Sequence, residues 1–421
     1  MKFGVNYTPR GGWFHSWLDF DPARVAEDMH TIAELGADHV RIFPLWPILQ
    51  PNRTLIRSQA IDDVATVVRL AHEAGLNSSV DVLQGHLSSF DFLPSWVSTW
   101  HRRNLFTDPN VVAGEVALVK TLAAAIKDQP GATGLTVGNE FIQFAALRHP
   151  DADRITPDQA AQWLATLLGA AKEVWPEGVH VHCHDDDLWF DDTHPFTPSS
   201  AVTYGDLTTV HSWVFGRVGP RFGAGTPQLT YFARYLCELA AAWSPDPARG
   251  LWLQEIGSPD NYVAVEDGPA FLLDTVDTLM GANGGGVSPN LEAITWWCSH
   301  DVSRALADFP NLEYSLGLID EGGRIKPIGE AFAEATRRYR DTHYAPPPAA
   351  GGAGEGQGRD SLVFDLPQWE RSATDATHTF FDQWMEHALA GDVRAIELNT
   401  DGYVEKTGTE GSVAPFLSTR D

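Results

Sequence analysis

Residues 134–140 (GLTVGNE) and 251–257 (LWLQEIG) are short, mostly apolar stretches, and each carries a glutamate toward its carboxyl end. The length and composition of both stretches favour buried β-strands. Burying a carboxylate costs free energy unless the group has a partner or a function. Two such strands in one chain therefore predict a paired-carboxylate active site formed by Glu140 and Glu255.

The chain around these two stretches alternates strands with helices as far as about residue 340. Strands are predicted at 3–6, 39–43, 77–83, 134–139, 180–184, 208–212, 251–255 and 293–297. Amphipathic helices are predicted at 22–35, 61–74, 111–127, 157–174, 229–243, 268–281 and 327–339. Eight strands alternating with helices favour a closed (β/α)₈ TIM barrel. The alternative is an open doubly wound sheet, which is disfavoured because no Gly-x-Gly-x-x-Gly follows the first strand.

The barrel is predicted to occupy residues 1–345, with long loops at its C-terminal face. Loops at 44–59, 84–109 and 184–206 are long enough to be functional. Residues 346–360 read as a Pro/Gly-rich linker. Residues 361–421 form a C-terminal appendage of unknown role, with a helix near 380–389 and a strand near 395–398. Because about 60 residues are marginal as an independent domain, we expect the appendage to dock on the barrel or on a second copy in a homo-oligomer.

Composition limits the partners of the chain. Its 421 residues carry a formal net charge of −27, whereas nucleic acids and anionic membranes require basic patches. No uninterrupted apolar run approaches the length of a membrane span, so neither a nucleic acid nor a membrane is predicted as partner. The three cysteines lack metal-type spacing, and we predict neither metal nor cofactor. The first residues enter a strand directly without a signal-peptide core, so we expect a cytoplasmic protein with a small neutral substrate.

The Asn139-Glu140 pair and Glu255 resemble the catalytic positions of the glycoside hydrolases of clan A, and of family 5 in particular. In that clan an Asn-Glu pair ends the fourth strand, and a second glutamate ends the seventh. The resemblance covers roughly residues 1–340. It implies a retaining mechanism without a cofactor, in which Glu255 is the nucleophile and Glu140 is the acid/base.

Further positions match the same family one by one. Arg41 lies near the end of the second strand, His211 near the end of the sixth, and Trp297 or its neighbour near the end of the eighth. The resemblance implies that Arg41 keeps the nucleophile ionised through charge-assisted hydrogen bonds. It also implies that Asn139 binds the 2-hydroxyl of the sugar and that Trp297 offers the sugar ring a flat apolar face.

Other substrate-binding candidates follow the strand ends. Many family members have an aromatic hydroxyl two residues after the sixth-strand histidine, where this chain has Trp213. Asp81 and His86 are polar residues near the end of the third strand, and Trp46 follows the second. For these positions, solvated loop residues and rim packing are the alternative interpretation.

The fifth predicted strand offers a competing hypothesis. His180, His182 and His184 alternate along it and share one face. Imidazoles in this pattern are zinc-type ligands, as in a metal-dependent sugar isomerase. Because ligands spaced along one straight strand lie ~6–7 Å apart, they would enclose an ion poorly. We therefore expect His184 to contact substrate and the deeper histidines to fill the barrel.

The substrate prediction depends on two further stretches. Residues 3–10 (FGVNYTPR) and 41–46 (RIFPLW) look most like a bacterial β-mannosidase subgroup within family 5. That resemblance implies action on short β-1,4-mannosides, including mannosyl-β-1,4-N-acetylglucosamine from N-glycan cores. Loops crowded around the barrel mouth favour exo action. The alternatives are an endo-β-1,4-mannanase or glucanase of the same family, and a non-catalytic sugar-binding barrel.

Overall fold

A curled sheet of parallel strands forms the centre of the computed structural model, which describes residues 1–100, 102–343, 360–366 and 370–403. Its seven strands run in the order β6-β3-β2-β1-β9-β8-β7. Their bounds are β1 (Lys2–Asn6), β2 (His39–Ile42), β3 (Asn77–Asp81), β6 (Ala132–Thr136), β7 (Thr208–Ser212), β8 (Leu251–Ile256) and β9 (Leu291–Trp296). All of these strands are paired in parallel, as connecting helices require.

The eighth position of the barrel is filled by residues 179–184, which the sequence predicts as a full strand. The backbone N–H of Val181 donates to Leu135 O, and Val181 O accepts from Val137, both at 2.9 Å. On the other side, Asp206 N donates to His180 O at 2.9 Å just before β7, and Thr209 Oγ1 of β7 donates to His182 O at 2.9 Å. The predicted strand at 180–184 is therefore wrong in its extent, because its contact with β7 is made by a hydroxyl instead of a backbone ladder. The closed TIM-barrel architecture itself is confirmed.

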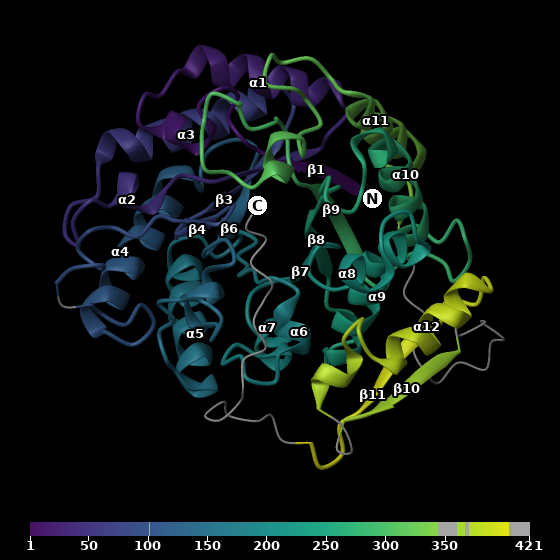
Figure 1. Ribbon diagram of the computed structural model, residues 1–421. Coiled ribbons are helices and arrows are strands. Elements are labelled where there is room, and N and C mark those ends of the chain that lie inside the picture. The colour runs from purple at the N-terminus through teal and green to yellow at the C-terminus, as the bar shows by residue number, and fades with distance from the viewer. Residues whose placement is uncertain (101, 344–359, 367–369, 404–421) are drawn as a thin grey trace.

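Helices surround the strands on all sides (Figure 1). The principal ones are α1 (Pro22–Glu34), α3 (Ser58–Glu73), α4 (Pro109–Ile126), α5 (Pro157–Val174), α9 (Pro227–Trp243), α10 (Gly268–Leu279) and α11 (Pro327–Tyr339). Several begin with proline at the first turn, where its missing N–H costs nothing. Asp108 caps α4 by accepting from the backbone N–H of Asn110 at 2.8 Å. The sequence predicts that α4 and α9 begin at 111 and 229, which is two residues late in each case. Both helices begin at the preceding proline, Pro109 or Pro227.

Short elements fold the long loops that follow the strand ends. They are η1 (Trp13–Trp17), α2 (Trp46–Leu49), β4 (His86–Leu87), β5 (Phe90–Asp91), η2 (Phe141–Ala145), α6 (Asp187–Phe190), α7 (Pro198–Thr203), α8 (Val218–Phe222), η3 (Val265–Asp267) and η4 (Asn311–Tyr314). β4 and β5 form an antiparallel hairpin that the sequence did not reveal. Its turn residues Ser88 and Ser89 have positive φ, which gives no typical hairpin signal.

One described helix, α4, is long and apolar enough to cross a membrane by length and composition. Glu115 and Lys120 interrupt its apolar sequence, so the helix is not an uninterrupted apolar run of the kind that the chain was predicted to lack. In the structure α4 packs against α3 and α5, and it buries Val111, Leu118 and Leu122. The apolar composition of the helix is therefore used in packing the outer ring of the barrel.

The described part of the appendage docks on the outside of the barrel, beside α8 and α9 (Figure 1). It comprises β10 (Ser361–Asp365), η5 (Arg371–Thr374), α12 (Thr379–Leu389) and β11 (Ala395–Asn399), in which β10 and β11 pair in parallel. The ring of Tyr235 in α9 lies 4.9 Å from Phe381 and 5.2 Å from Trp384, measured between centroids. The predicted linker lies outside the described residues except for Asp360, and self-association through the appendage stays a prediction.

The close approach of β6 to residues 179–184 gives a first test. A Cβ on Gly134 would lie 1.7 Å from the carbonyl oxygen of Val179, so Gly134→Ala must push this segment away. We expect a loss of about 1–3 kcal/mol in unfolding free energy, measured by urea denaturation. Gly169→Ala in α5 is the control, because a Cβ there meets nothing within 4 Å. The control should gain up to about 1 kcal/mol, and equal shifts in both variants would contradict the close packing.

Candidate active site

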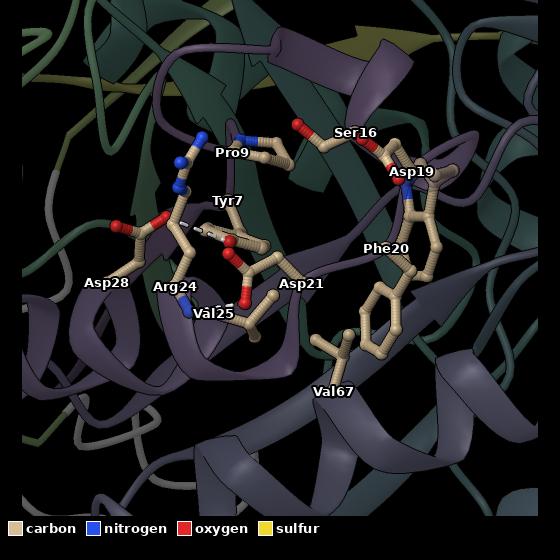
Figure 2. Close-up of a pocket in the computed structure, with 11 residues that line it drawn as sticks. Tyr7, Pro9, Ser16, Asp19, Phe20, Asp21, Arg24, Val25, Asp28 and Val67 are labelled. Carbon is tan, nitrogen blue, oxygen red and sulfur yellow. Dashed lines mark hydrogen bonds between the residues drawn. The ribbon is translucent and has the colours of Figure 1, made fainter.

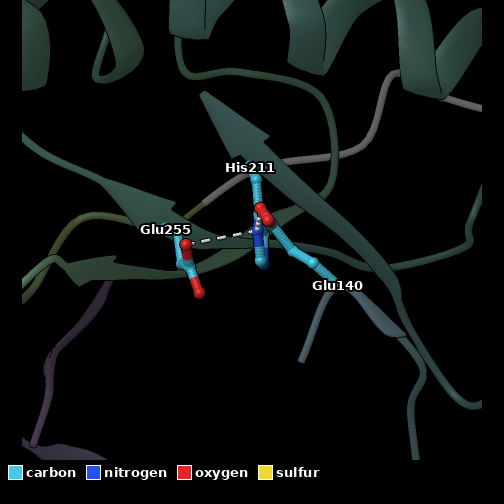
Figure 3. Close-up of side chains that lie close together, drawn as sticks. All are labelled: Glu140, His211 and Glu255. Atoms are coloured by element: carbon cyan, nitrogen blue, oxygen red, sulfur yellow. Dashed lines mark hydrogen bonds and ion pairs between the residues drawn. The ribbon is translucent and has the colours of Figure 1, made fainter. Parts of the chain in front are cut away.

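Glu140, His211 and Glu255 meet at the carboxyl ends of β6, β7 and β8 (Figure 3). Their carboxylate oxygens and imidazole nitrogen all lie within 4.8 Å of one another. His211 Nδ1 is 2.7 Å from Glu140 Oε1 and 3.3 Å from Glu255 Oε2. The barrel therefore brings the two sequence-predicted carboxylates together, with an imidazole bridging them.

The spacing of the two carboxylates indicates the class of chemistry. Retaining glycosidases hold their carboxyl groups ~5–5.5 Å apart, whereas inverting enzymes leave ~6.5–9.5 Å for a water molecule. Oxygens of Glu140 and Glu255 within 4.8 Å of each other correspond to the retaining arrangement. One carboxyl group can then attack the anomeric carbon while the other protonates the glycosidic oxygen.

Arg41 sets the state of Glu255. Its Nη1 donates to Glu255 Oε1 at 2.8 Å, while Nε and Nη2 donate to the two oxygens of Asp81 at 2.8 and 2.7 Å. Nη2 also donates to Asn139 Oδ1 at 2.7 Å. Burial raises the pKa of Glu255, and His211 and Arg41 oppose that rise. The charge-assisted bond from Arg41 favours an ionised Glu255, as a nucleophile requires.

The Glu140 carboxyl lies in a different electrostatic environment from that of Glu255. Burial, and then the charge of Asp185, raise the pKa of Glu140 to about 7, against lowering effects of His86 and Arg148. Two adjacent carboxyls whose pKa values are pushed apart divide into an acid and an ionised partner. Glu140 is thus a proton donor near neutral pH.

The hydrogen-bond network gives His211 a defined tautomer. The amide of Gln254 donates to Thr136 Oγ1 at 3.1 Å, which leaves Gln254 Oε1 to accept from His211 Nε2–H at 3.4 Å. Burial lowers the pKa of His211 and favours a neutral ring, so Nδ1 is the acceptor. A protonated Glu140 fits this acceptor, in agreement with its raised pKa.

The backbone of Glu140 is held in an unusual conformation, with φ 40° and ψ 30°. A non-glycine residue in the left-handed region is strained and persists only where neighbours fix it. Glu140 N donates to Cys183 Sγ at 3.1 Å, and that thiol donates to Gly138 O at 3.2 Å. From the sequence, Cys183 is only one of three cysteines that lack metal-type spacing. Its alternation with the flanking histidines was the available signal, because it places the thiol on the opposite face.

An aromatic cluster joins three of the loops that follow the strand ends. Trp13 in the loop after β1 lies 4.7 Å from Phe309 in the loop after β9, and 5.7 Å from Phe90 in the hairpin after β3. Phe90 and Phe309 are themselves 4.8 Å apart, all between ring centroids. Three loops therefore meet in one aromatic wall, which we define as Trp13, Phe90 and Phe309.

Several solved structures are closely similar to this chain. A GH5_18 protein from Streptomyces cattleya is 46% identical, with 96% of this chain and 95% of that chain covered and a TM-score of 0.88. This chain belongs to the GH5_18 glycoside hydrolases. A GH5_18 protein from Bifidobacterium longum subsp. longum is 43% identical over 96% of this chain and 92% of that chain, with a TM-score of 0.88. The resemblance to family 5 is thereby confirmed.

A more distant structure shares the fold. The exo-β-1,4-mannosidase Op5Man5 from Opitutaceae bacterium strain TAV5 is 23% identical to this chain. The match covers 94% of this chain and 69% of that chain, with a TM-score of 0.74. No protein-family model and no curated protein matches the sequence.

Three predicted substrate contacts of the GH5_18 chain require correction. Asp81 is fully buried beneath Arg41, so it positions that guanidinium instead of facing a sugar. Trp46 is also fully buried, and its indole N–H donates to Gln50 Oε1 at 2.9 Å. His184 lies on the outer side of the barrel wall, since Cys183 next to it faces Arg41, and its ring packs 5.4 Å from Trp189.

The histidine-face metal hypothesis does not fit the structure either. His180 donates from Nε2 to Trp175 O at 2.8 Å and accepts the Leu135 N–H at Nδ1, so both its nitrogens are used. His180 therefore points toward the end of α5, and His182 shares that face of the segment, so neither histidine fills the barrel. Among the described residues, the one group of ligand-type atoms close enough for a metal ion is the Glu140, His211 and Glu255 set. The 2.7 Å contact between His211 and Glu140 is a hydrogen bond that occupies the coordinating atoms.

The remaining predicted residues lie at the mouth. Trp297 and Trp213 follow β9 and β7, and their rings meet edge to face at 6.5 Å. His86 is half-buried in the hairpin, its Nδ1 lies 2.8 Å from Asp91 Oδ1, and its carbonyl accepts from Asn139 Nδ2 at 3.4 Å. These positions suit contact with a ligand that lies over the two glutamates.

Sequence reasoning missed Glu313, a third buried carboxyl near the site. Burial raises the pKa of Glu313 to about 7, and the charge of Glu255 contributes to the rise. Glu313 lies in η4, within an irregular loop after β9. No strand or helix pattern in the sequence singles it out.

A separate hollow between η1, α1 and α3 does not share these features (Figure 2). Two of the carboxylates that line it, Asp21 and Asp28, have structural partners. Asp28 accepts from the Tyr7 hydroxyl at 3.0 Å, and Asp21 caps α1 by accepting from Ala23 N at 3.0 Å. The mouth of the barrel is therefore the candidate active site of the GH5_18 chain.

The raised pKa of Glu140 predicts a pH-dependent stability. A carboxyl whose pKa moves from 4.5 to about 7 on folding stabilises the fold below pH 4.5, and this contribution is lost as the pH rises through 7. The loss amounts to about 3 kcal/mol, since each pKa unit is worth about 1.4 kcal/mol. Glu140→Gln should therefore gain stability relative to the wild type between pH 5 and pH 8, measured by urea denaturation.

The exposed Glu386 of α12 offers the matched control for this series. Glu386→Gln should follow the wild type across the same pH range. A difference between Glu140→Gln and the wild type that stays constant with pH would show that Glu140 titrates at its ordinary value.

Proposed function

We propose that this chain is a retaining exo-β-mannosidase that hydrolyses short β-1,4-mannosides such as Manβ1-4GlcNAc. The facing pair of Glu140 and Glu255, of which Glu255 accepts from Arg41 while the pKa of Glu140 is raised to about 7, supports glycoside hydrolysis. The choice of substrate is supported by the 46% and 43% identical GH5_18 proteins, each crystallised as a glutamate-to-alanine variant in complex with Manβ1-4GlcNAc.

In the first step Glu255 attacks the anomeric carbon of the mannosyl unit. The bond from that carbon to the glycosidic oxygen breaks, and Glu140 gives its proton to the departing oxygen. The product is a mannosyl ester of Glu255, and GlcNAc leaves. Arg41 stays hydrogen-bonded to the nucleophile, so little reorganisation is required as its charge is transferred.

In the second step the Glu140 carboxylate takes a proton from water. The resulting hydroxide equivalent attacks the anomeric carbon, breaks the ester and releases mannose with retained configuration. A pKa near 7 suits Glu140 for both directions of proton transfer. Each of the two steps inverts the configuration at the anomeric carbon, so the two together retain it. The same two carboxyl groups act in both steps.

Exo action is supported by the aromatic wall, which would limit how far a sugar chain extends past the mannose. An endo-β-1,4-mannanase or glucanase needs a groove open on both sides of the cleaved bond. The wall is built from three separate loops packed ring against ring, so it is a fixed part of the mouth.

Covalent trapping tests the assignment of the nucleophile. A 2-fluoro-β-mannoside with a good leaving group should inactivate the enzyme in a time-dependent way, because the fluorine slows hydrolysis of the ester. Peptide mapping by mass spectrometry should place the label on Glu255. Glu140→Ala serves as the control, because it keeps the nucleophile and should still be labelled by an activated donor. A label on another residue would overturn the assignment.

Product analysis distinguishes exo from endo action. With mannobiose and with mannohexaose, an exo enzyme releases mannose as its first product from both substrates. Chromatography of early time points should therefore show mannose and mannopentaose from the hexamer. Early mannobiose or mannotriose from the hexamer would indicate an endo-mannanase instead.

A further inference from the structure

A group of buried charges fills the space between Glu140 and the appendage. Residues 185–187 are three consecutive aspartates at the start of α6, and all three are buried. Two guanidiniums, those of Arg148 and Arg217, pair with them. Three carboxyl groups and two guanidiniums therefore meet directly beside the acid/base, and burial raises the pKa of one of these carboxyls, Asp186, to about 7.

Gln143 connects this charge group to Glu140. Its Nε2 donates to Asp185 and, at 3.4 Å, to Glu140 Oε2, while its Oε1 accepts from Arg148 Nε at 3.2 Å. Arg148 in turn pairs with both Asp185 and Asp187. The position of the Glu140 carboxyl therefore depends on where residues 185–187 are held.

The appendage contributes one carboxylate, that of Asp375, to this series of contacts. Arg217 precedes α8 and pairs with Asp187 through Nη2 and with Asp375 through Nη1. Its guanidinium also lies 4.7 Å from the ring centroid of Phe190 in α6. Asp375 is fixed by its own turn, because its Oδ1 accepts from Thr377 N at 2.8 Å. A guanidinium held between two anions and a ring has one defined position.

The appendage holds the end of the same loop by its backbone. Arg371 N donates to Asp192 Oδ1 at 3.0 Å, and the Arg371 side chain donates to Asp191 O. The hydroxyl of Tyr235 in α9 donates to Thr374 O, which anchors this part of the appendage to the barrel. The appendage therefore holds residues 187–192 at both ends. Asp375 acts on Asp187 through Arg217, and Arg371 bonds to residues 191 and 192.

We infer that the C-terminal appendage is a working part of the active site, in which Asp375 is a positioning residue that holds Glu140 in place through Arg217, residues 185–187 and Gln143. This role rests on the proposed function, since it requires Glu140 to protonate the leaving oxygen. The leaving sugar must lie on the Glu140 side of the cleaved bond, where this group of charges is found.

The leaving group of the substrate separates this role from a purely structural one. GlcNAc requires a proton from Glu140 to depart, whereas 2,4-dinitrophenolate is stable enough to depart without one. The ratio kcat/KM reports on steps up to the formation of the mannosyl ester. A displaced Glu140 therefore lowers kcat/KM for Manβ1-4GlcNAc and spares kcat/KM for 2,4-dinitrophenyl β-mannoside. A partly unfolded preparation lowers both equally.

The experiment compares Asp375→Asn with Asp382→Asn in the full chain. Asn keeps the acceptor for Thr377 N and removes only the charge that fixes Arg217. Asp382 is the matched control because it also joins the appendage to the barrel, through Arg221 at 2.8 Å, and Arg221 belongs to the far end of α8. Asp375→Asn should lower the disaccharide-to-aryl ratio of kcat/KM at least tenfold, whereas Asp382→Asn should leave it within twofold.

Equal losses with both substrates, or no loss, in Asp375→Asn would overturn the positioning role. If that variant does not fold, Arg217→Lys replaces it, because lysine keeps the charge and cannot bridge Asp187 and Asp375. The same tenfold drop in the ratio is then expected, and an unchanged ratio overturns the role. A wild-type enzyme inactive on both substrates would instead overturn the proposed function.

Discussion

The Arg41 guanidinium is the interaction on which the rest of the site depends. It is fully buried, and it is satisfied by Asp81, Glu255 and Asn139 at 2.7–2.8 Å. Breaking a buried ion pair from one side typically costs about 3–5 kcal/mol, because the remaining charge is left without a partner. The same cation fixes the nucleophile and the asparagine that precedes the acid/base. One side chain of β2 therefore holds the nucleophile directly and the residue before the acid/base.

From this cation a continuous polar network reaches the acid/base by a second route. Asp81 receives a hydrogen bond from Thr136, which accepts from Gln254, which in turn faces His211. The groups come from β3, β6, β7 and β8, which are distant in sequence and adjacent at the barrel mouth. In a low-dielectric interior such bonds reinforce one another, so the protonation states of the two glutamates are linked. Parallel strands make the network possible because all their carboxyl ends meet on one face.

Local patterns in the sequence were sufficient for the barrel and for the two glutamates. Apolar strand lengths, proline at helix starts and a carboxylate at a strand end are properties of short stretches. The errors concern side-chain direction. His184 and Cys183 are neighbours on one segment, and their roles depend on which face looks inward, which is decided by packing against β6 and β7. The surroundings of Asp81 and Glu313 likewise consist of residues that are remote in sequence. Hydrophobic periodicity, which is a local pattern, does not predict such contacts.

The aromatic wall of Trp13, Phe90 and Phe309 has a consequence for substrate supply. An enzyme walled on one side of the cleaved bond works only where a sugar chain terminates. Its useful substrate concentration is then the number of free non-reducing ends, whatever the length of the molecules that carry them. Long polymers offer few ends per unit mass, and disaccharides offer the most. Its throughput is therefore governed by the enzymes that create ends, and it rises as they shorten the pool.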